Sequence, residues 1–240
     1  MKNIIKYLFG KTPTPHGDLI LEEGSQRSQI KKINLTGKVP ICSPPSPLGS
    51  VSKKETENPK ENLRLREAAK EKEIILIVKR TSEIFGLSPS LVLAIIYQES
   101  YRANGNWHDA IYAIRQEDGF FKRYILGKKL TGYVPIKFPP SKATERHMRS
   151  VSFGLMQVML TTAREHEFDS PYATSLLDIE TNIYYGCLIL RRKIDRHKDL
   201  DTGIMAYNGR PHAAATKEYL VKIKELQKEL ALQIETGEVK

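Results

Sequence analysis

The sequence predicts a mostly α-helical domain that follows an extended N-terminal tail. Three observations lead to this prediction. Apolar residues recur at helical spacing from about residue 62 onward, proline and polar residues dominate the first sixty positions, and no long stretch alternates polar with apolar residues. We therefore expect a tail over residues 1–61 and a helical domain over 62–240, with irregular structure near 103–150.

Composition excludes several classes of protein. The chain has 240 residues, a formal net charge of +10 and 40% hydrophobic residues, which suits a globular domain rather than a fully disordered or collagen-like chain. No run approaches the roughly 18 apolar residues of a membrane-spanning helix, so no transmembrane segment is expected. Two cysteines, Cys42 and Cys187, are too few for a disulfide scaffold or a structural zinc site.

The first sixty residues have the composition of a linker. They hold 7 of the 13 prolines and 10 Lys/Arg residues against 5 Asp/Glu residues. Such a segment buries too little apolar surface to offset the entropy of ordering, so we expect it to be extended or disordered and dispensable for the activity of the helical domain. The opening Met1–Gly10 is no standard signal peptide, because Lys6 interrupts a short apolar run and no clear cleavage site follows.

The remaining chain shows helical spacing. Apolar residues over 63–85 predict a helix that ends before Gly86, and Ser88-Pro89 then provides an N-cap with proline at the first helical position. The apolar run 91–96 predicts a central, buried helix. Further helical patterns cover 154–166, 180–197, 201–207 and 212–233. Only short pieces near 131–138 suggest strands.

Glu99 is the first candidate for chemistry. It ends the strongly apolar helix, so its carboxyl group is expected at the edge of a low-dielectric core. Desolvation favours the neutral form of a carboxyl group, which is how a glutamate becomes a general acid near neutral pH. The alternative is a solvated glutamate, or one paired with a nearby arginine.

Two further segments are candidates for a cleft. Gly154 is expected to open a helix in which Met156, Gln157 and Met159 crowd the first turns, where glutamine offers an amide and methionine a soft apolar wall. The alternative is that these methionines pack in the core. At the end of a short helix, the hydroxyl of Tyr207 is available to donate to a carboxylate.

Together and in this order, the motifs resemble a known family. They are Glu99-Ser100, Gly154-Leu-Met-Gln-Val-Met159, Asn182-Ile-Tyr-Tyr-Gly186 and Ala206-Tyr-Asn-Gly209, and in this arrangement they resemble the lysozyme-like domain of the soluble (SLT) lytic transglycosylases over about 75–220. The resemblance implies a lysozyme-like helical domain that acts on peptidoglycan glycan strands. It implies neither a metal ion nor an organic cofactor, because this chemistry needs neither.

The resemblance also implies roles for single residues. Glu99 matches the single catalytic acid and base, and Tyr207 matches the tyrosine whose hydroxyl holds that carboxylate. The residues that match substrate-binding positions are Ser152, Met156, Gln157, Met159 and Asn208. Asn182 and Gly186 match helix-packing positions.

The chain departs from the family pattern between Glu99 and the glutamine motif. Gln157 lies 58 positions after Glu99, so a sizeable insertion separates them, similar to a long-insertion subgroup of phages and bacteria. The serine before the motif is either Ser150 or Ser152, of which we favour Ser152. The insertion adds Glu117 as a candidate second carboxylate and Trp107 as a candidate sugar-stacking platform. An ion pair of Glu117 with Arg115, and packing of Trp107, are the alternatives.

The implied activity is that of a glycosidic bond lyase, which forms 1,6-anhydro-N-acetylmuramic acid with one glutamate. A hydrolytic muramidase on the same fold, or a non-catalytic wall-binding or virion module, are the alternatives. Nucleic acid is not expected as a partner, since no basic stripe interleaved with aromatic residues occurs. The expected setting is the cell envelope or periplasm, reached by specialised export through a wall-spanning secretion assembly, or a phage particle.

Overall fold

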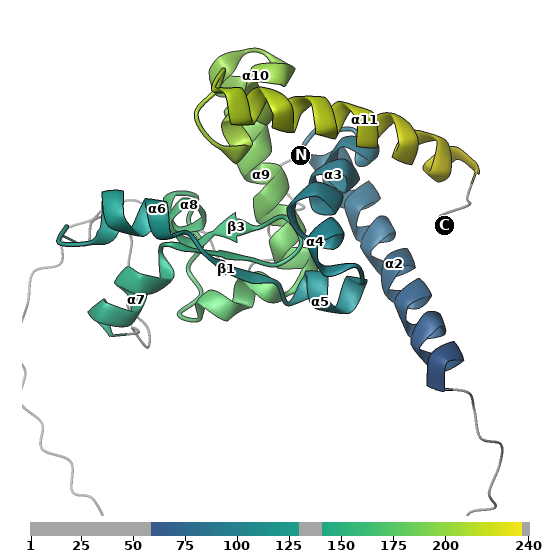
Figure 1. Cartoon of the computed structure of the whole chain (residues 1–240), viewed down its shortest axis with the longest axis horizontal. Helices are drawn as coiled ribbons and strands as arrows, with labels where there is room; N and C mark the ends of the chain where they lie inside the picture. The colour runs from purple at the N-terminus through teal and green to yellow at the C-terminus, as the bar shows by residue number, and fades with distance from the viewer. Residues whose placement is uncertain (1–58, 130–140, 237–240) are drawn as a thin grey trace, which may run out of the picture. The chain divides into compact units, whose positions relative to one another are not determined.

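The computed structural model describes residues 59–129 and 141–236 (Figure 1). Nearly all of the expected tail, and the suggested strand pieces near 131–138, lie outside the described residues. Helix α2 begins at Pro59, three residues before the expected start of the domain. Within the described ranges, no helix is both long and apolar enough to cross a membrane.

The fold is mostly helical, as the sequence predicts. The first half contains α2 (Pro59–Ile84), α3 (Pro89–Ile96), η1 (Tyr97–Tyr101), α4 (Arg102–Asn104), α5 (Trp107–Ile111), α6 (Asp118–Phe120), η2 (Phe121–Ile125) and α7 (Lys142–Met148). The second half contains α8 (Leu160–Glu165), η3 (Ala173–Leu177), α9 (Ile179–His197), α10 (Leu200–Asn208) and α11 (Ala214–Thr236). Three short strands, β1 (Ile114–Gln116), β2 (Val151–Phe153) and β3 (Val158–Met159), complete the described structure.

Helix α3 is the centre of the core, which confirms the prediction for the apolar run. Every residue from Leu91 to Ile96 is at most 2% exposed. Helices α2 and α11 pack against α3, and α9 packs against α2 and α10 (Figure 1). Gly86 ends the preceding turn with a φ of +60°, a conformation that glycine adopts without strain.

The glutamine motif does not open a helix, contrary to the sequence prediction. Strands β1, β2 and β3 form an antiparallel sheet in that order, and residues 154–157 form the turn between β2 and β3. The next helix, α8, begins only at Leu160. Strands of two or three residues are too short to produce a period-2 pattern, and this is why the sequence did not reveal them.

Helix α9 holds this turn in place. Asn182 donates to the carbonyl oxygens of Phe153 and Leu176, both at 2.7 Å, and accepts from the backbone N–H of Met156 at 2.8 Å. A Cβ at Gly154, whose φ is +69°, would lie only 2.6 Å from the Asn182 amide nitrogen. The turn therefore needs glycine at 154 and asparagine at 182.

A buried ion cluster anchors the insertion to the rest of the domain. Glu145 of α7 accepts from Arg149 at 3.0 Å and from Arg164 of α8 at 3.1 Å. Arg164 also donates to the backbone oxygens of Phe168 and Ser170. All three charged side chains are at most 7% exposed, so each charge depends on its partners for compensation.

We predict that Glu145→Gln lowers the free energy of unfolding by about 3–5 kcal/mol, because it removes the buried negative charge that Arg149 and Arg164 share. The matched control is Glu180→Gln, which breaks the exposed Arg80–Glu180 pair and should cost at most about 1 kcal/mol. Urea unfolding monitored by circular dichroism measures both. Equal losses in the two variants would contradict this account of the cluster.

Candidate active site

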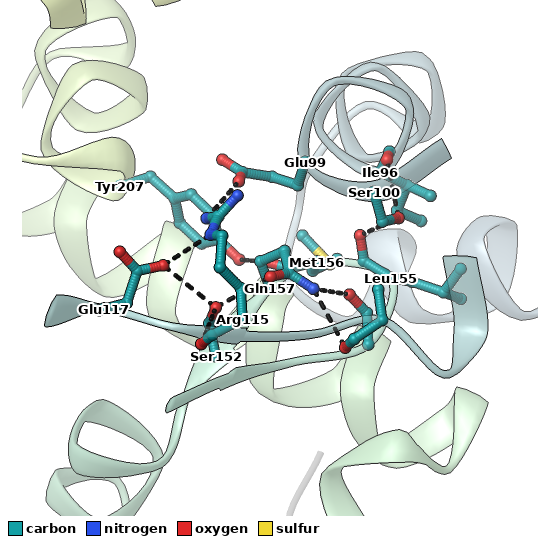
Figure 2. Close-up of polar contacts among 12 residues, drawn as sticks. Ile96, Glu99, Ser100, Arg115, Glu117, Ser152, Leu155, Met156, Gln157 and Tyr207 are labelled. Atoms are coloured by element: carbon teal, nitrogen blue, oxygen red, sulfur yellow. Dashed lines mark hydrogen bonds and ion pairs between the residues drawn. The ribbon is translucent and has the colours of Figure 1, made fainter. Parts of the chain in front are cut away.

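Glu99 lies on a single π-helical turn that continues α3. The backbone N–H of Arg102 donates to the carbonyl oxygen of Tyr97, five residues back, and such local widening of a helix is frequent at functional sites. The neighbouring Ser100 hydroxyl donates to the carbonyl oxygen of Leu155 at 2.8 Å. This bond ties the segment that carries Glu99 to the β2–β3 turn (Figure 2).

The surroundings of Glu99 favour its neutral form. Its side chain is only 8% exposed, and this burial raises its pKa above the ordinary value. The Tyr219 hydroxyl, the Arg115 guanidinium and the Asn208 amide partly oppose the rise, whereas the carboxylate of Glu117 adds to it. Desolvation is the largest of these effects, so Glu99 is suited to donate a proton.

Arg115 connects the two carboxyl groups of the site (Figure 2). Its Nε lies 2.7 Å from Oε1 of Glu117, and its terminal nitrogen lies 3.7 Å from Oε2 of Glu99. Arg115 is half-exposed on β1, and Glu117 occupies the N-cap position of the short helix α6 without a capping hydrogen bond to its side chain. The expected alternative for Glu117, an ion pair with Arg115, is therefore present.

Ser152 and Gln157 lie next to this ion pair, on the β2 strand and the turn that follows it. The buried Ser152 hydroxyl lies 2.8 Å from Oε1 of Gln157 and 3.2 Å from Oε1 of Glu117. The amide nitrogen of Gln157 donates to the carbonyl oxygens of Gly154 at 2.8 Å and Ala113 at 3.3 Å. The Gln157 amide is thus bonded at both ends, and these bonds stabilise its unusual φ of +46°.

The hydroxyl of Ser150 is bonded to residues of the insertion. The Ser150 hydroxyl donates to the carbonyl oxygen of His147 at 2.7 Å and accepts from the Gln116 amide at 2.9 Å. Ser152, not Ser150, is therefore the serine that adjoins Glu117 and Gln157, in agreement with the preference from sequence.

Met156 is not exposed at the site, contrary to its expected role in substrate binding. Its side chain is fully buried, and a Cβ at Gly186 would lie 2.2 Å from its sulfur, so it packs tightly against α9. The alternative of core packing is correct for this residue. Met159 is only partly buried, and Asn208 is exposed beside Glu99, so both remain candidates for substrate contact.

Tyr207 is bonded differently from what the resemblance implies. Its hydroxyl donates to the carbonyl oxygen of Met156 at 2.8 Å, and a hydroxyl has only one proton to donate (Figure 2). The hydroxyl that influences Glu99 belongs to Tyr219 of α11. Although this hydroxyl is buried, it has no partner at ordinary hydrogen-bond distance among the described residues. It lies close enough to the Glu99 carboxyl group to lower the pKa of that group.

Trp107 is not a sugar-stacking platform. It is 2% exposed, and its ring centroid lies 4.4 Å from that of Tyr101 and 5.5 Å from that of Tyr97. The alternative, packing, is correct for this residue.

Among residues 59–129 and 141–236, no group of three or more His, Cys, Asp or Glu side chains is arranged to hold a metal ion.

Comparison with known proteins identifies the family. A family model of the transglycosylase SLT domain matches residues 77–229, more than half of the chain. The chain belongs to the SLT transglycosylase family. A protein of Enterobacteria phage PRD1 named transglycosylase is 37% identical over 76 residues, which is 30% of this chain and 27% of that protein. The match thus spans about a quarter of that relative's length, and no solved structure gives a significant match.

The sequence did not indicate that two further residues, Tyr219 and Arg115, act on Glu99. Tyr219 lies one helical turn before Ile223 on the buried face of α11, so its pattern is that of an ordinary core residue. Arg115 was recognised only as a partner for Glu117, because nothing in the sequence places it within reach of Glu99. The register between β1 and β2, which pairs Arg115 with Ser152, supplies that information.

The raised pKa of Glu99 predicts how the stability of this SLT domain depends on pH. Below the unfolded-state pKa of about 4.5, Glu99 is neutral in both the folded and the unfolded protein, so its burial carries no cost for a charge. As the pH rises through the folded-state pKa, the buried carboxyl group ionises and this contribution to the free energy of unfolding is lost. We therefore predict that Glu99→Gln is more stable than the wild type at pH 8 and that the difference vanishes below pH 4. Melting temperatures across this range measure the effect, and a variant that is less stable at pH 8 would contradict it.

Proposed function

We propose that this protein is a lytic transglycosylase of peptidoglycan, with residues 62–240 as its catalytic domain. It cleaves the β-1,4 bond between N-acetylmuramic acid and N-acetylglucosamine and leaves a 1,6-anhydro-N-acetylmuramic acid end. One observation carries the proposal: in a chain of the SLT family, Glu99 is buried, has a raised pKa and lies beside the small sheet.

In the first step, the protonated Glu99 donates its proton to the glycosidic oxygen while the bond from that oxygen to C1 of muramic acid breaks. The N-acetylglucosamine part leaves as an alcohol. Positive charge develops on the muramic ring, and the carbonyl oxygen of its own N-acetyl group stabilises that charge. The Glu99 carboxylate left behind is stabilised by the Arg115 guanidinium and by the amide and hydroxyl groups of Asn208 and Tyr219.

In the second step, the Glu99 carboxylate accepts the proton of the muramic acid 6-hydroxyl, whose oxygen attacks C1 and closes the anhydro ring. The carboxyl group is thereby restored to its protonated form. Water is not consumed, so the reaction needs no second carboxylate to activate it. Burial favours the neutral form of Glu99, whereas the positive charge of Arg115 favours the ionised form. Because the two effects partly cancel, both forms are accessible, which supports the double role of Glu99.

Hydrolysis by a muramidase is the competing reaction, and it needs a group that activates water. Glu117 is the available carboxylate, but its Oε1 accepts from Arg115 at 2.7 Å and lies 3.2 Å from the Ser152 hydroxyl. This oxygen is thus already engaged by two protein donors and is less available to orient a water molecule, which favours internal ring closure over attack by water.

The setting that we propose is the bacterial envelope, reached by specialised export or as part of a phage particle. The similarity to a phage protein named transglycosylase supports the latter. We also propose that residues 1–61 are a tail outside the catalytic domain.

We predict that Glu99→Gln lowers the rate of peptidoglycan cleavage by at least about 100-fold, because loss of a general acid costs two to four orders of magnitude. The matched control is Glu117→Gln, which should keep most of the activity. Digests of purified peptidoglycan are reduced with borohydride and analysed by mass spectrometry. Anhydro ends resist reduction and are lighter than reducing ends by one water.

The products separate the two reactions. Reducing ends that disappear in Glu117→Gln would establish the hydrolase and overturn our proposal. Anhydro ends made at a normal rate by Glu99→Gln would remove Glu99 from its catalytic role. A wild-type protein that sediments with peptidoglycan but releases no ends would instead be a wall-binding module.

We predict different effects for the two tyrosines near Glu99. Tyr219→Phe removes a hydroxyl that lowers the pKa of Glu99, so the alkaline limb of the kcat/KM profile should move to higher pH. Tyr207→Phe removes the bond to Met156, so it should lower the free energy of unfolding by about 0.5–1.5 kcal/mol and leave the alkaline limb in place.

Initial rates from pH 4 to pH 9, together with urea unfolding, measure both tyrosine variants. The assignment of Tyr219 would be wrong if only Tyr207→Phe moved the alkaline limb. That result would restore the role that the family resemblance implies for Tyr207.

A further inference from the structure

A groove of about 340 Å³ lies between the insertion and helix α8, and its lining shares no residue with the site around Glu99. Phe120 and Tyr124 line it, with ring centroids 4.9 Å apart. Lys128, Lys129 and Arg146 also line it. We call this cavity the basic groove; the rest of its lining is Ile125, Arg149, Thr161 and Glu165.

The positive charge of the basic groove is not compensated within the described part of the chain. Lys128 and Lys129 are exposed, and no described carboxylate lies within ion-pair distance of either. The buried Nε of Arg146 has no hydrogen-bond partner among the described residues. Glu165 is the single acidic side chain in the lining, so the groove presents an excess of donors and positive charge to a ligand.

One wall of the basic groove is rigid before any ligand binds. Arg146 lies on α7, and Glu145 of the same helix is bonded to Arg164 of α8 in the buried ion cluster. Thr161 of α8 also lines the groove. Because the ion cluster fixes α7 against α8, binding does not have to order this wall, and less affinity is lost to conformational entropy.

The basic groove begins close to the catalytic network. Glu117 pairs with Arg115, which reaches Glu99, and the backbone oxygen of Glu117 accepts from the N–H of Phe121 at 2.8 Å. Phe120, in the groove lining, is therefore only three residues from a carboxylate of the site. We therefore expect the side branches of a polymer bound across Glu99 to reach the groove.

We infer that the basic groove binds the carboxylate-bearing peptide branches of peptidoglycan, an inference that rests on the proposed function. These peptides extend from N-acetylmuramic acid, the sugar whose bond is cleaved. They combine free carboxylates with apolar alkyl groups. The lysines and Arg146 match the carboxylates, and the faces of Phe120 and Tyr124 match the alkyl groups. The enzyme thus prefers strands that still carry peptides.

The chemistry of the groove favours peptide carboxylates over the sugar chain itself. The sugars of the glycan backbone are mostly uncharged and need hydrogen-bond acceptors as well as donors. Lys128, Lys129 and Arg146 line the groove and have no paired carboxylate among the described residues. Glu165 is the one acidic side chain in this lining. Such a set discriminates for anions.

The test compares the full chain with Lys128→Ala/Lys129→Ala. The matched control is Lys72→Ala/Lys79→Ala, which removes the same charge from exposed positions of α2. Each protein is assayed on intact peptidoglycan and on glycan strands stripped of peptides by an amidase. Released ends give kcat and KM, and co-sedimentation with each material gives binding.

The wild type and the control should show a lower KM on intact than on stripped strands. The groove variant should raise KM on intact strands by about three- to tenfold, as expected for the loss of two exposed charge pairs, with kcat unchanged and stripped strands unaffected. Equal loss on both substrates, equal loss in the control, or no loss at all would overturn the inference. If the wild type cleaved neither substrate, the proposed function would fail, and the same comparison by co-sedimentation would still decide the role of the groove.

Discussion

A carboxyl group at the edge of a dry core is the feature around which this molecule is organised. Helix α3 is buried along its whole apolar run, and the π-helical turn that continues it carries Glu99 out only as far as the surface of the core. The Ser100 bond to Leu155 holds that turn against the sheet. Burial raises the pKa of Glu99, so the packing that stabilises the fold also creates the acid.

The insertion supplies the opposite side of the site. Strand β1 brings Arg115 to Ser152, and from there the guanidinium group reaches both Glu117 and Glu99. The buried charges of Glu145 and Arg164 fix the insertion to α8, the helix that follows the glutamine motif. An added segment can influence catalysis in this way only if it is anchored, since a mobile cation would be screened by water.

The sequence predicted those features that depend on local pattern. The buried helix, the position of Glu99 at its end and the mostly helical fold follow from apolar spacing, and the order of the motifs indicated the family. The sheet could not be predicted, because its strands are too short to show a period. The role of Tyr219, like the burial of Met156, depends on how α11 and α9 pack, and sequence spacing does not specify this.

The most direct test of this account is the pKa of Glu99 itself. In protein labelled with ¹³C at the glutamate side-chain carboxyl carbon, a pH titration by NMR follows each carboxyl group, and the spectrum of Glu99→Gln identifies the signal of Glu99. We predict that this signal titrates above the ordinary glutamate pKa of 4.5, because desolvation outweighs Arg115 and Tyr219. A signal that titrates at or below 4.5 would contradict the claim that burial makes Glu99 an acid.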